Sequence, residues 1–175
     1  MPPLRITGGA LRGRRVPVPD GEVRPTSERA RQAYFNIVGD RIHGARFLDL
    51  FAGSGVFSLE ALSRGAAEAV AVERSRRQCA AIEQIARDLG VTVRALAGDA
   101  IGMLPTTLFD LVYADPPYDY DAYDALLAAI TARSLAADAL VAIEHRRRTA
   151  PFHDPPLREI RHSEYGEVSI TFFER

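Results

Sequence analysis

Continuous apolar stretches alternate with stretches of helical periodicity along most of the chain. The apolar stretches cover residues 46–51, 69–73, 91–96, 109–114 and 139–145. Apolar residues that recur every three or four positions predict helices at about 27–40, 56–64, 76–89 and 121–133. Strands this apolar are buried on both faces, so their alternation with helices indicates a parallel sheet covered by helices on both sides.

Two strand-like regions flank this alternation. Residues 4–18 contain two short strand-like pieces around glycines, which predicts a small β-hairpin because glycine permits the turn. Residues 157–165 and 167–175 join at Gly166 with no room for a helix, which predicts an antiparallel pair. The sequence therefore predicts an α/β fold with a mostly parallel seven-stranded sheet, a C-terminal antiparallel hairpin and a small N-terminal hairpin.

The composition is that of an ordinary globular domain. Of the 175 residues, 47% are apolar and 26% are charged. No apolar run approaches the ~20 residues of a membrane span, and no signal-peptide core is evident, so we expect a soluble cytoplasmic protein. We also expect a monomer, because nothing in the sequence suggests an obligate assembly. The single cysteine, Cys79, lies on the apolar face of a predicted helix, and no Cys/His cluster has zinc-ligand spacing. The sequence predicts neither a disulfide nor a metal site.

Basic residues are concentrated near the N-terminus, although the net charge is only −1. All the basic residues are arginine, and those of the N-terminal region are Arg5, Arg12, Arg14, Arg15 and Arg24. We therefore divide the chain into a basic arm, residues 1–26, and a main domain, residues 27–175. A basic arm on a nearly neutral body suggests contact with a polyanion, but charge alone equally allows a solvated surface.

Polar residues and glycines follow the strands, where an open parallel sheet binds its ligands. Residues 49–55 read DLFAGSG, and such glycines let backbone N–H groups approach a ligand at the start of a helix. Ser58 stands where a dinucleotide-binding turn has its third glycine. Glu73 ends the second strand 18 residues after Gly55, which suits hydrogen bonds to ribose hydroxyls. Asp99 ends the third strand, where it is placed either to bind an adenine amine or to cap a turn.

The fourth strand ends in the unusual run D-P-P-Y, residues 115–118. Two prolines cannot continue a strand, and they fix the backbone of the turn while leaving carbonyls without local donors. Asp115 adds a carboxylate and Tyr118 adds a flat aromatic face. Acceptors beside a stacking ring suit a flat group that carries an amine, whereas the simpler alternative is a rigid surface turn.

These four sites together resemble the class I S-adenosylmethionine-dependent methyltransferases that modify exocyclic amines, which have a Rossmann-like fold. Further motifs resemble the RsmD family, which are bacterial 16S ribosomal RNA guanine-N2 methyltransferases. These motifs are RITGGALRGRR at residues 5–15, RPT at 24–26, RQAYFN at 31–36 and LDLFAGSG at 48–55. The resemblance implies methylation of the N2 amine of a specific guanine in 16S rRNA, within the 30S subunit or an assembly intermediate.

The resemblance also implies a role for each site. The residues implied to bind S-adenosylmethionine are Asp49, Phe51, Gly53, Gly55, Glu73, Asp99 and Ala100. The residues implied to act on the base are Asp115, Pro116, Pro117 and Tyr118. By this resemblance, Asp115 and the Pro116 carbonyl accept from the guanine amine, while Tyr118 stacks on the ring. The resemblance further implies that the arm arginines contact RNA phosphates. It also implies that S-adenosylhomocysteine is the product and that no metal takes part.

Several alternatives share parts of this pattern. An adenine-N6 or cytosine-N4 DNA methyltransferase, or a glutamine methyltransferase, uses a similar turn of acid or amide, two prolines and an aromatic residue. A dinucleotide-dependent oxidoreductase shares the glycine turn, but Ser58 and the D-P-P-Y run argue against it.

The three arginines at residues 146–148 are interpreted as a solvated strand end rather than as an RNA contact.

Overall fold

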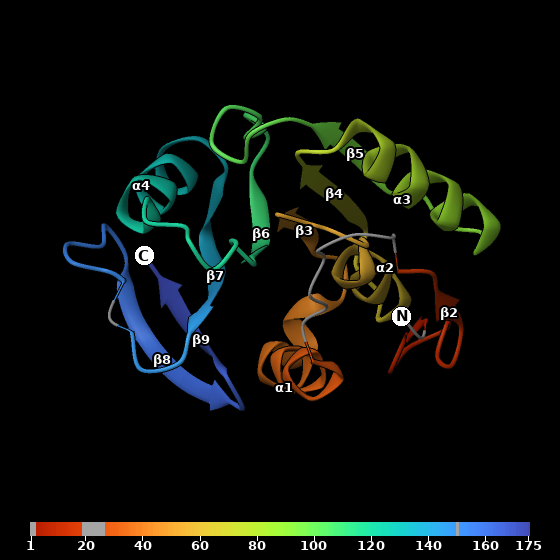
Figure 1. The fold of residues 1–175 in the computed structure, drawn as a ribbon, viewed down its shortest axis with the longest axis horizontal. Coiled ribbons are helices and arrows are strands. Elements are labelled where there is room, and N and C mark those ends of the chain that lie inside the picture. The colour runs from red at the N-terminus through yellow and green to blue at the C-terminus, as the bar shows by residue number, and fades with distance from the viewer. Residues whose placement is uncertain (1–2, 19–26, 150) are drawn as a thin grey trace.

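A computed structural model of the chain describes residues 3–18, 27–149 and 151–175 and contains one large sheet (Figure 1). Its seven strands run in the order β5-β4-β3-β6-β7-β9-β8. Their bounds are β3 Arg46–Leu50, β4 Glu68–Glu73, β5 Arg94–Ala97, β6 Phe109–Ala114, β7 Leu135–Arg146, β8 Arg158–Tyr165 and β9 Val168–Glu174. Strands β3 to β7 pair in parallel, whereas β9 is antiparallel to both β7 and β8. The predicted mostly parallel seven-stranded sheet and its antiparallel C-terminal hairpin are confirmed.

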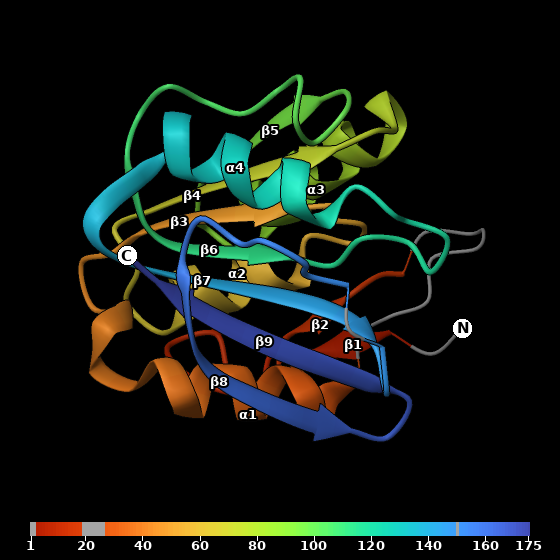
Figure 2. The ribbon, with the colours of Figure 1, turned by 90° about the vertical axis from the view of Figure 1, so that its left-hand side faces the viewer.

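Helices cover both faces of this sheet (Figures 1 and 2). Their bounds are α1 Glu28–Val38, α2 Val56–Ser63, α3 Arg76–Asp88 and α4 Tyr123–Arg133, with a short 3-10 helix at Gly39–Ile42. Helices α1, α2 and α3 pack on one face and α4 packs on the other, which gives two separate apolar cores. None of the helices found in the described residues is both long enough and apolar enough to cross a membrane.

Serine side chains begin two of the helices. The Ser27 hydroxyl accepts a hydrogen bond from the Ala30 N–H at 3.1 Å, and Ser75 accepts one from the Gln78 N–H at 3.3 Å. Each bond satisfies an N–H that has no partner within its own helix. The predicted strand boundaries differ more from the structure. Strand β5 begins at Arg94 rather than at residue 91, and β7 begins at Leu135 rather than at residue 139.

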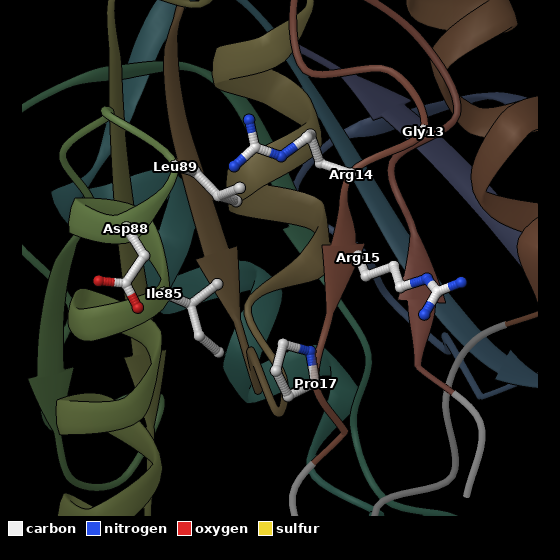
Figure 3. A pocket seen from close by; sticks show the side chains of 7 residues that line it. All are labelled: Gly13, Arg14, Arg15, Pro17, Ile85, Asp88 and Leu89. Atoms are coloured by element: carbon white, nitrogen blue, oxygen red, sulfur yellow. The ribbon is translucent and has the colours of Figure 1, made fainter.

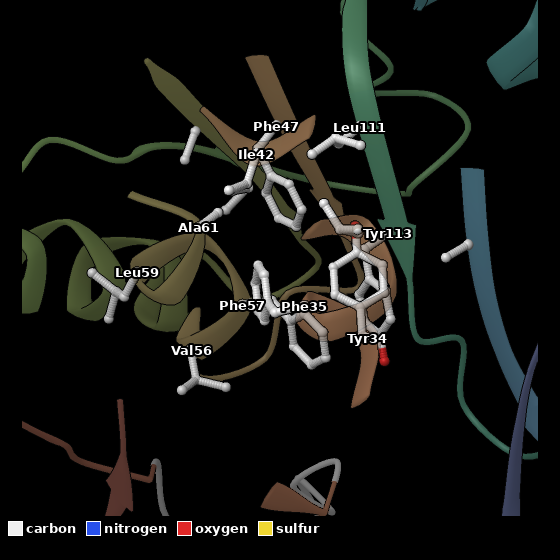
Figure 4. Close-up of a cluster of buried hydrophobic side chains, with 14 of the residues drawn as sticks. Tyr34, Phe35, Ile42, Phe47, Val56, Phe57, Leu59, Ala61, Leu111 and Tyr113 are labelled. Atoms are coloured by element: carbon white, nitrogen blue, oxygen red, sulfur yellow. The ribbon is translucent and has the colours of Figure 1, made fainter. Parts of the chain in front are cut away.

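An aromatic cluster forms the centre of the core beneath α1 and α2 (Figure 4). The rings of Phe57 and Tyr113 stack with centroids 3.8 Å apart, and Tyr34 meets Tyr113 edge-on at 5.0 Å. Aromatic pairs of this kind add to the stability that apolar burial alone provides. The cluster fixes the end of β6 against α1 and α2, immediately before the D-P-P-Y turn.

The N-terminal hairpin, formed by β1 Leu4–Arg5 and β2 Arg15–Val16, is held on the domain by a buried ion pair. Arg31 Nε lies 2.7 Å from Glu60 Oε2, and both side chains are fully buried. Arg31 Nη2 donates to the Arg5 carbonyl, and the hydroxyl of Thr7 donates to Glu60. The small hairpin is thus confirmed, and its apolar side chains belong to the core of the main domain. The division at residue 26 stays a prediction.

Candidate active site at the carboxyl ends of the strands

A cavity of about 1070 Å³ lies at the carboxyl ends of the parallel strands. Its walls come from the ends of β3, β4, β5 and β6, from the start of α1 and from the turn between β8 and β9. Nine of the residues singled out from the sequence line it: Phe51, Gly53, Glu73, Asp99, Ala100, Asp115, Pro116, Pro117 and Tyr118. The structure therefore brings segments that are far apart in the sequence to one place. Asp49 and Gly55 are buried beside this cavity rather than in its lining.

The glycine turn after β3 needs unusual backbone angles. Gly53 and Gly55 have φ values of 54° and 73°, and Phe51 has a φ of 60°, a value that non-glycine residues seldom adopt. A Cβ atom on Gly55 would lie 2.8 Å from the Ile82 side chain, so glycine is required for close packing as well. The strained Phe51 backbone stands at the cavity wall, where it turns the chain toward α2.

Asp49 is a buried carboxylate at the end of β3. Its Oδ2 accepts hydrogen bonds from the Ser58 N–H at 3.1 Å and from the Ser58 hydroxyl at 2.8 Å. Burial raises the pKa of Asp49 to about 7, because loss of water costs the charged form more than the bonds from Ser58 return. Asp115 and Glu73 raise this pKa further through charge repulsion. Ser58, noted above for replacing a glycine, thus has a definite partner.

Backbone N–H groups fix the two carboxylates of the neighbouring strand ends. Glu73 Oε2 accepts from the Gly53 N–H at 3.0 Å, and Oε1 accepts from the Ser75 N–H at 2.9 Å. Asp99 Oδ1 accepts from the N–H groups of Ile101 and Gly102 at 3.0 and 2.9 Å, which closes a turn. Both carboxylates line the cavity. Because backbone N–H groups hold them, their positions are set before any ligand enters.

The D-P-P-Y turn forms another part of the wall. The Asp115 N–H donates to the Leu50 carbonyl at 3.2 Å, which ties the turn to the end of β3. Pro116 is buried, whereas Tyr118 is 39% exposed and offers its ring to the cavity. The Arg146 guanidinium lies 4.8 Å from the centroid of the Tyr118 ring, a cation–π contact that places Arg146 beside this wall.

Several lining residues were not singled out from the sequence. Glu144 of β7 is 5% exposed and lines the cavity, and the Tyr113 hydroxyl donates to its Oε2 at 2.7 Å. The turn of the C-terminal hairpin, residues 165–168, and Arg29 at the start of α1 also contribute. A glutamate inside an otherwise apolar strand was the one available signal for Glu144.

The arm arginines occupy a different part of the surface. Arg5, Arg12, Arg14 and Arg15 are exposed and do not line the cavity. Arg14 and Arg15 border a second hollow of about 450 Å³ between the arm and α3 (Figure 3). Arg24, also assigned to RNA contact, lies outside the described residues. Within residues 3–18, 27–149 and 151–175, no group of three or more His, Cys, Asp or Glu side chains is placed to hold a metal ion.

Comparisons with known proteins give a consistent result. The model of the family described as conserved hypothetical protein 95 matches residues 4–174. Escherichia coli "Ribosomal RNA small subunit methyltransferase D" is 40% identical over 66% of this chain and 60% of that protein. Bacillus subtilis "Putative rRNA methyltransferase YlbH" is 30% identical over 98% of this chain and 99% of that protein. The solved structure titled "Putative methyltransferase yhhF from Escherichia coli" has a TM-score of 0.87 and 32% identity, and the match covers 98% of this chain and 97% of that chain.

Proposed function

We propose that this chain, which belongs to the family described as conserved hypothetical protein 95, methylates the exocyclic N2 amine of a guanine in 16S ribosomal RNA. S-adenosylmethionine is the proposed methyl donor. The match to the Escherichia coli methyltransferase D spans 60% of that protein, so activity, substrate and partners are carried over as a proposal. One observation supports the chemistry above all, namely that the D-P-P-Y turn lines the same cavity as Glu73 and Asp99.

The residues of the cavity fit the proposed donor. Its wall carries the carboxylates of Glu73 and Asp99, and acids at these strand ends suit the ribose hydroxyls and amine of a nucleoside. Gly53 has no side chain, so the donor can approach the backbone of this turn closely. S-adenosylmethionine, when bound, supplies an electrophilic methyl group and leaves as S-adenosylhomocysteine. No metal ion is required for this transfer.

The residues of the D-P-P-Y turn act on the amine. Guanine N2 is a weak nucleophile because its lone pair is delocalised into the ring. Hydrogen bonds from N2–H to the Asp115 carboxylate and the Pro116 carbonyl favour the pyramidal nitrogen that can attack. Positive charge develops on N2 as the N–C bond forms, and a fixed carboxylate stabilises that charge more than it stabilises the neutral base. The nitrogen then passes one proton to the Asp115 carboxylate, from which water takes it, and a neutral amine remains.

The base has to leave its stack to reach this turn. Unstacking and unpairing cost a few kcal/mol, and stacking on Tyr118 returns roughly 1–3 kcal/mol of this. The exposed arginines of the arm are proposed to hold RNA phosphates and so to set the register of the target. We expect the protein to act in the cytoplasm, as a monomer, on rRNA within the 30S subunit or an assembly intermediate.

Labelled methyl transfer tests this proposal. The purified protein is offered labelled S-adenosylmethionine with 16S rRNA, 30S subunits, duplex DNA and a release-factor protein in parallel. Digested products are then separated and identified by mass spectrometry. We expect N2-methylguanosine in ribosomal RNA and no label in DNA or protein. Label in N6-methyladenine, N4-methylcytosine or glutamine would contradict the guanine assignment.

A further inference from the structure

Two carboxylates emerge side by side from one face of the sheet at the cavity. Ala114, the last residue of β6, pairs with Ile143 of β7, so Asp115, directly after β6, stands level with Glu144 of β7. Tyr113 and Ala142, two residues earlier, both point into the core on the face covered by α1 to α3. Because side chains alternate between faces along a strand, Glu144 projects to that same face. Asp115, whose N–H still bonds to the Leu50 carbonyl of β3, continues the alternation of β6, and β7 lies about 4.8 Å from β6.

Glu144 is held rigidly in this position. The Tyr113 hydroxyl donates to its Oε2 at 2.7 Å, and the Tyr113 ring is stacked on Phe57 at 3.8 Å. Ile170 of β9 pairs with Glu144 on its other side, so the carboxylate is flanked by strands in both directions. A carboxylate buried at this level costs stability unless polar partners compensate. Its position in the cavity lining gives it a direct route to a ligand.

We propose that Glu144 determines base specificity by accepting the N1–H of the target guanine, beside the N2 amine held by Asp115. This inference rests on the proposed function. A carboxylate has about four acceptor positions, so Glu144 can accept from both Tyr113 and a ligand. The Watson–Crick edge of guanine carries N1–H and N2–H as adjacent donors, and two neighbouring carboxylates are complementary to such a pair.

The same pair of acceptors rejects other amine-bearing bases. Adenine has an unprotonated N1 beside its amine, and cytosine has an unprotonated N3 beside its amine. If Asp115 held the amine of adenine or cytosine, the Glu144 carboxylate would face the unprotonated ring nitrogen, which is also an acceptor. Neither the carboxylate nor the ring nitrogen would then regain the hydrogen bond that it had made with water. Discrimination by an unpaired buried polar group is strong, whereas discrimination by shape alone is weak.

A substituted RNA separates this reading from a purely structural role. In 16S rRNA made by ligation, the target guanine is replaced by 2-aminopurine, which keeps the N2 amine but has neither the N1–H nor the O6 carbonyl of guanine. The change in preference between the wild-type protein and Glu144→Gln then reports on N1. Both RNAs are offered free and assembled into 30S subunits, and kcat/KM is measured for each. The wild-type protein is expected to prefer guanine by at least about 100-fold. In Glu144→Gln the amide can donate to N1 of 2-aminopurine, so the preference should fall below about 10-fold.

Two further variants keep the test decisive. Glu164→Gln makes the same chemical change on the exposed side of the C-terminal hairpin, where Glu164 pairs with Arg147 at 2.8 Å. This variant should keep the wild-type preference. Glu144→Asp keeps an acceptor and should retain the preference for guanine at lower kcat/KM. Because the preference is a ratio within one preparation, partial loss of folded protein does not change it.

The outcomes distinguish the two proposals. Equal methylation of both RNAs by the wild-type protein would overturn the role of Glu144 while leaving guanine-N2 transfer in place, whether or not any variant folds. An unchanged preference in Glu144→Gln would do the same. If the wild-type protein makes no N2-methylguanosine in free 16S rRNA or in 30S subunits, the proposed function itself is wrong. The proposed role of Glu144 is then wrong as well.

Discussion

The two ends of the cavity are built in different ways. At the end formed by β3, β4 and β5, the carboxylates are fixed by backbone N–H groups of nearby turns, as with Glu73 on Gly53 and Ser75. At the end formed by β6 and β7, the fixing groups are side chains. Glu144 is held there by Tyr113, and the Tyr118 ring lies against Arg146.

This difference assigns separate tasks to the two ends. Carboxylates that are held by backbone N–H groups have fixed positions before a ligand binds, and they suit a cofactor that is the same in every catalytic cycle. The other end combines a partly exposed ring with two adjacent acids, and it suits a base that must be selected and activated. Variants at one end should therefore alter one step and spare the other.

The largest effect is expected at Asp115. Asp115→Ala removes the carboxylate that stabilises the developing charge on the amine, so kcat should fall by about 10³-fold. The affinity for S-adenosylmethionine, measured by calorimetry, should stay within a few-fold of wild type because the backbone-held carboxylates are untouched. Normal turnover in this variant would contradict the catalytic assignment. A matching loss of cofactor affinity would show that the two ends are not separable.

Asp49 provides a pH-dependent test of the β3 end. Its pKa in the folded state is about 7, well above its ordinary value of 3.8, because it is buried. The folded protein therefore binds a proton that the unfolded chain releases, and the free energy of unfolding decreases as pH rises from about 4 to 7.

Asp49→Asn cannot ionise and should lose this decrease. Relative to wild type, its unfolding free energy should rise by roughly 2–4 kcal/mol between pH 4 and pH 8, measured by chemical denaturation without ligand. If the difference between the two proteins does not vary with pH, then Asp49 does not titrate in this window.

The contrast between the two ends of the cavity also explains how much of the fold and of the site could be predicted from the sequence. The alternation of strand, turn and helix and the glycine turn are local signals, and the structure has them where the pattern indicates. Nine of the residues selected from the motifs share one cavity. The motifs mark strand ends, and the topology of a parallel sheet brings strand ends together.

Residues missed by the sequence analysis depend on pairing between distant segments. Glu144 reaches the cavity because β7 lies next to β6, and the turn at residues 165–168 reaches it because β9 pairs with β7. Arg31 begins a motif named from the sequence, but its burial against Glu60, a residue of another helix, was not predicted. No local pattern of apolar and polar residues encodes such partners, since long-range pairing decides them.

A smaller effect is expected at Glu73. Glu73→Gln keeps one acceptor for the backbone but loses the charge-assisted bonds to the ribose, so the Kd for S-adenosylmethionine should rise by about 10–100-fold. With saturating cofactor, kcat should recover to near wild type. Glu83→Gln is the matched control, because Glu83 also accepts a backbone N–H, from Ala95 at 3.1 Å, but lies outside the cavity lining. Equal losses in both variants would indicate a structural effect.

The smallest effect belongs to the arm, which lies outside both ends of the cavity. Replacing Arg12, Arg14 and Arg15 by alanine removes phosphate contacts, so RNA affinity should fall by about tenfold at 0.15 M salt and the slope of log K against log salt should flatten. A control that replaces Arg87, Arg158 and Arg161, which are exposed on α3 and β8, matches the change in net charge. If both triple variants lose the same affinity and slope, general charge rather than the arm attracts the RNA. If only the arm variant changes, while cofactor affinity and kcat at saturating RNA stay constant, then substrate capture is separate from both chemical steps.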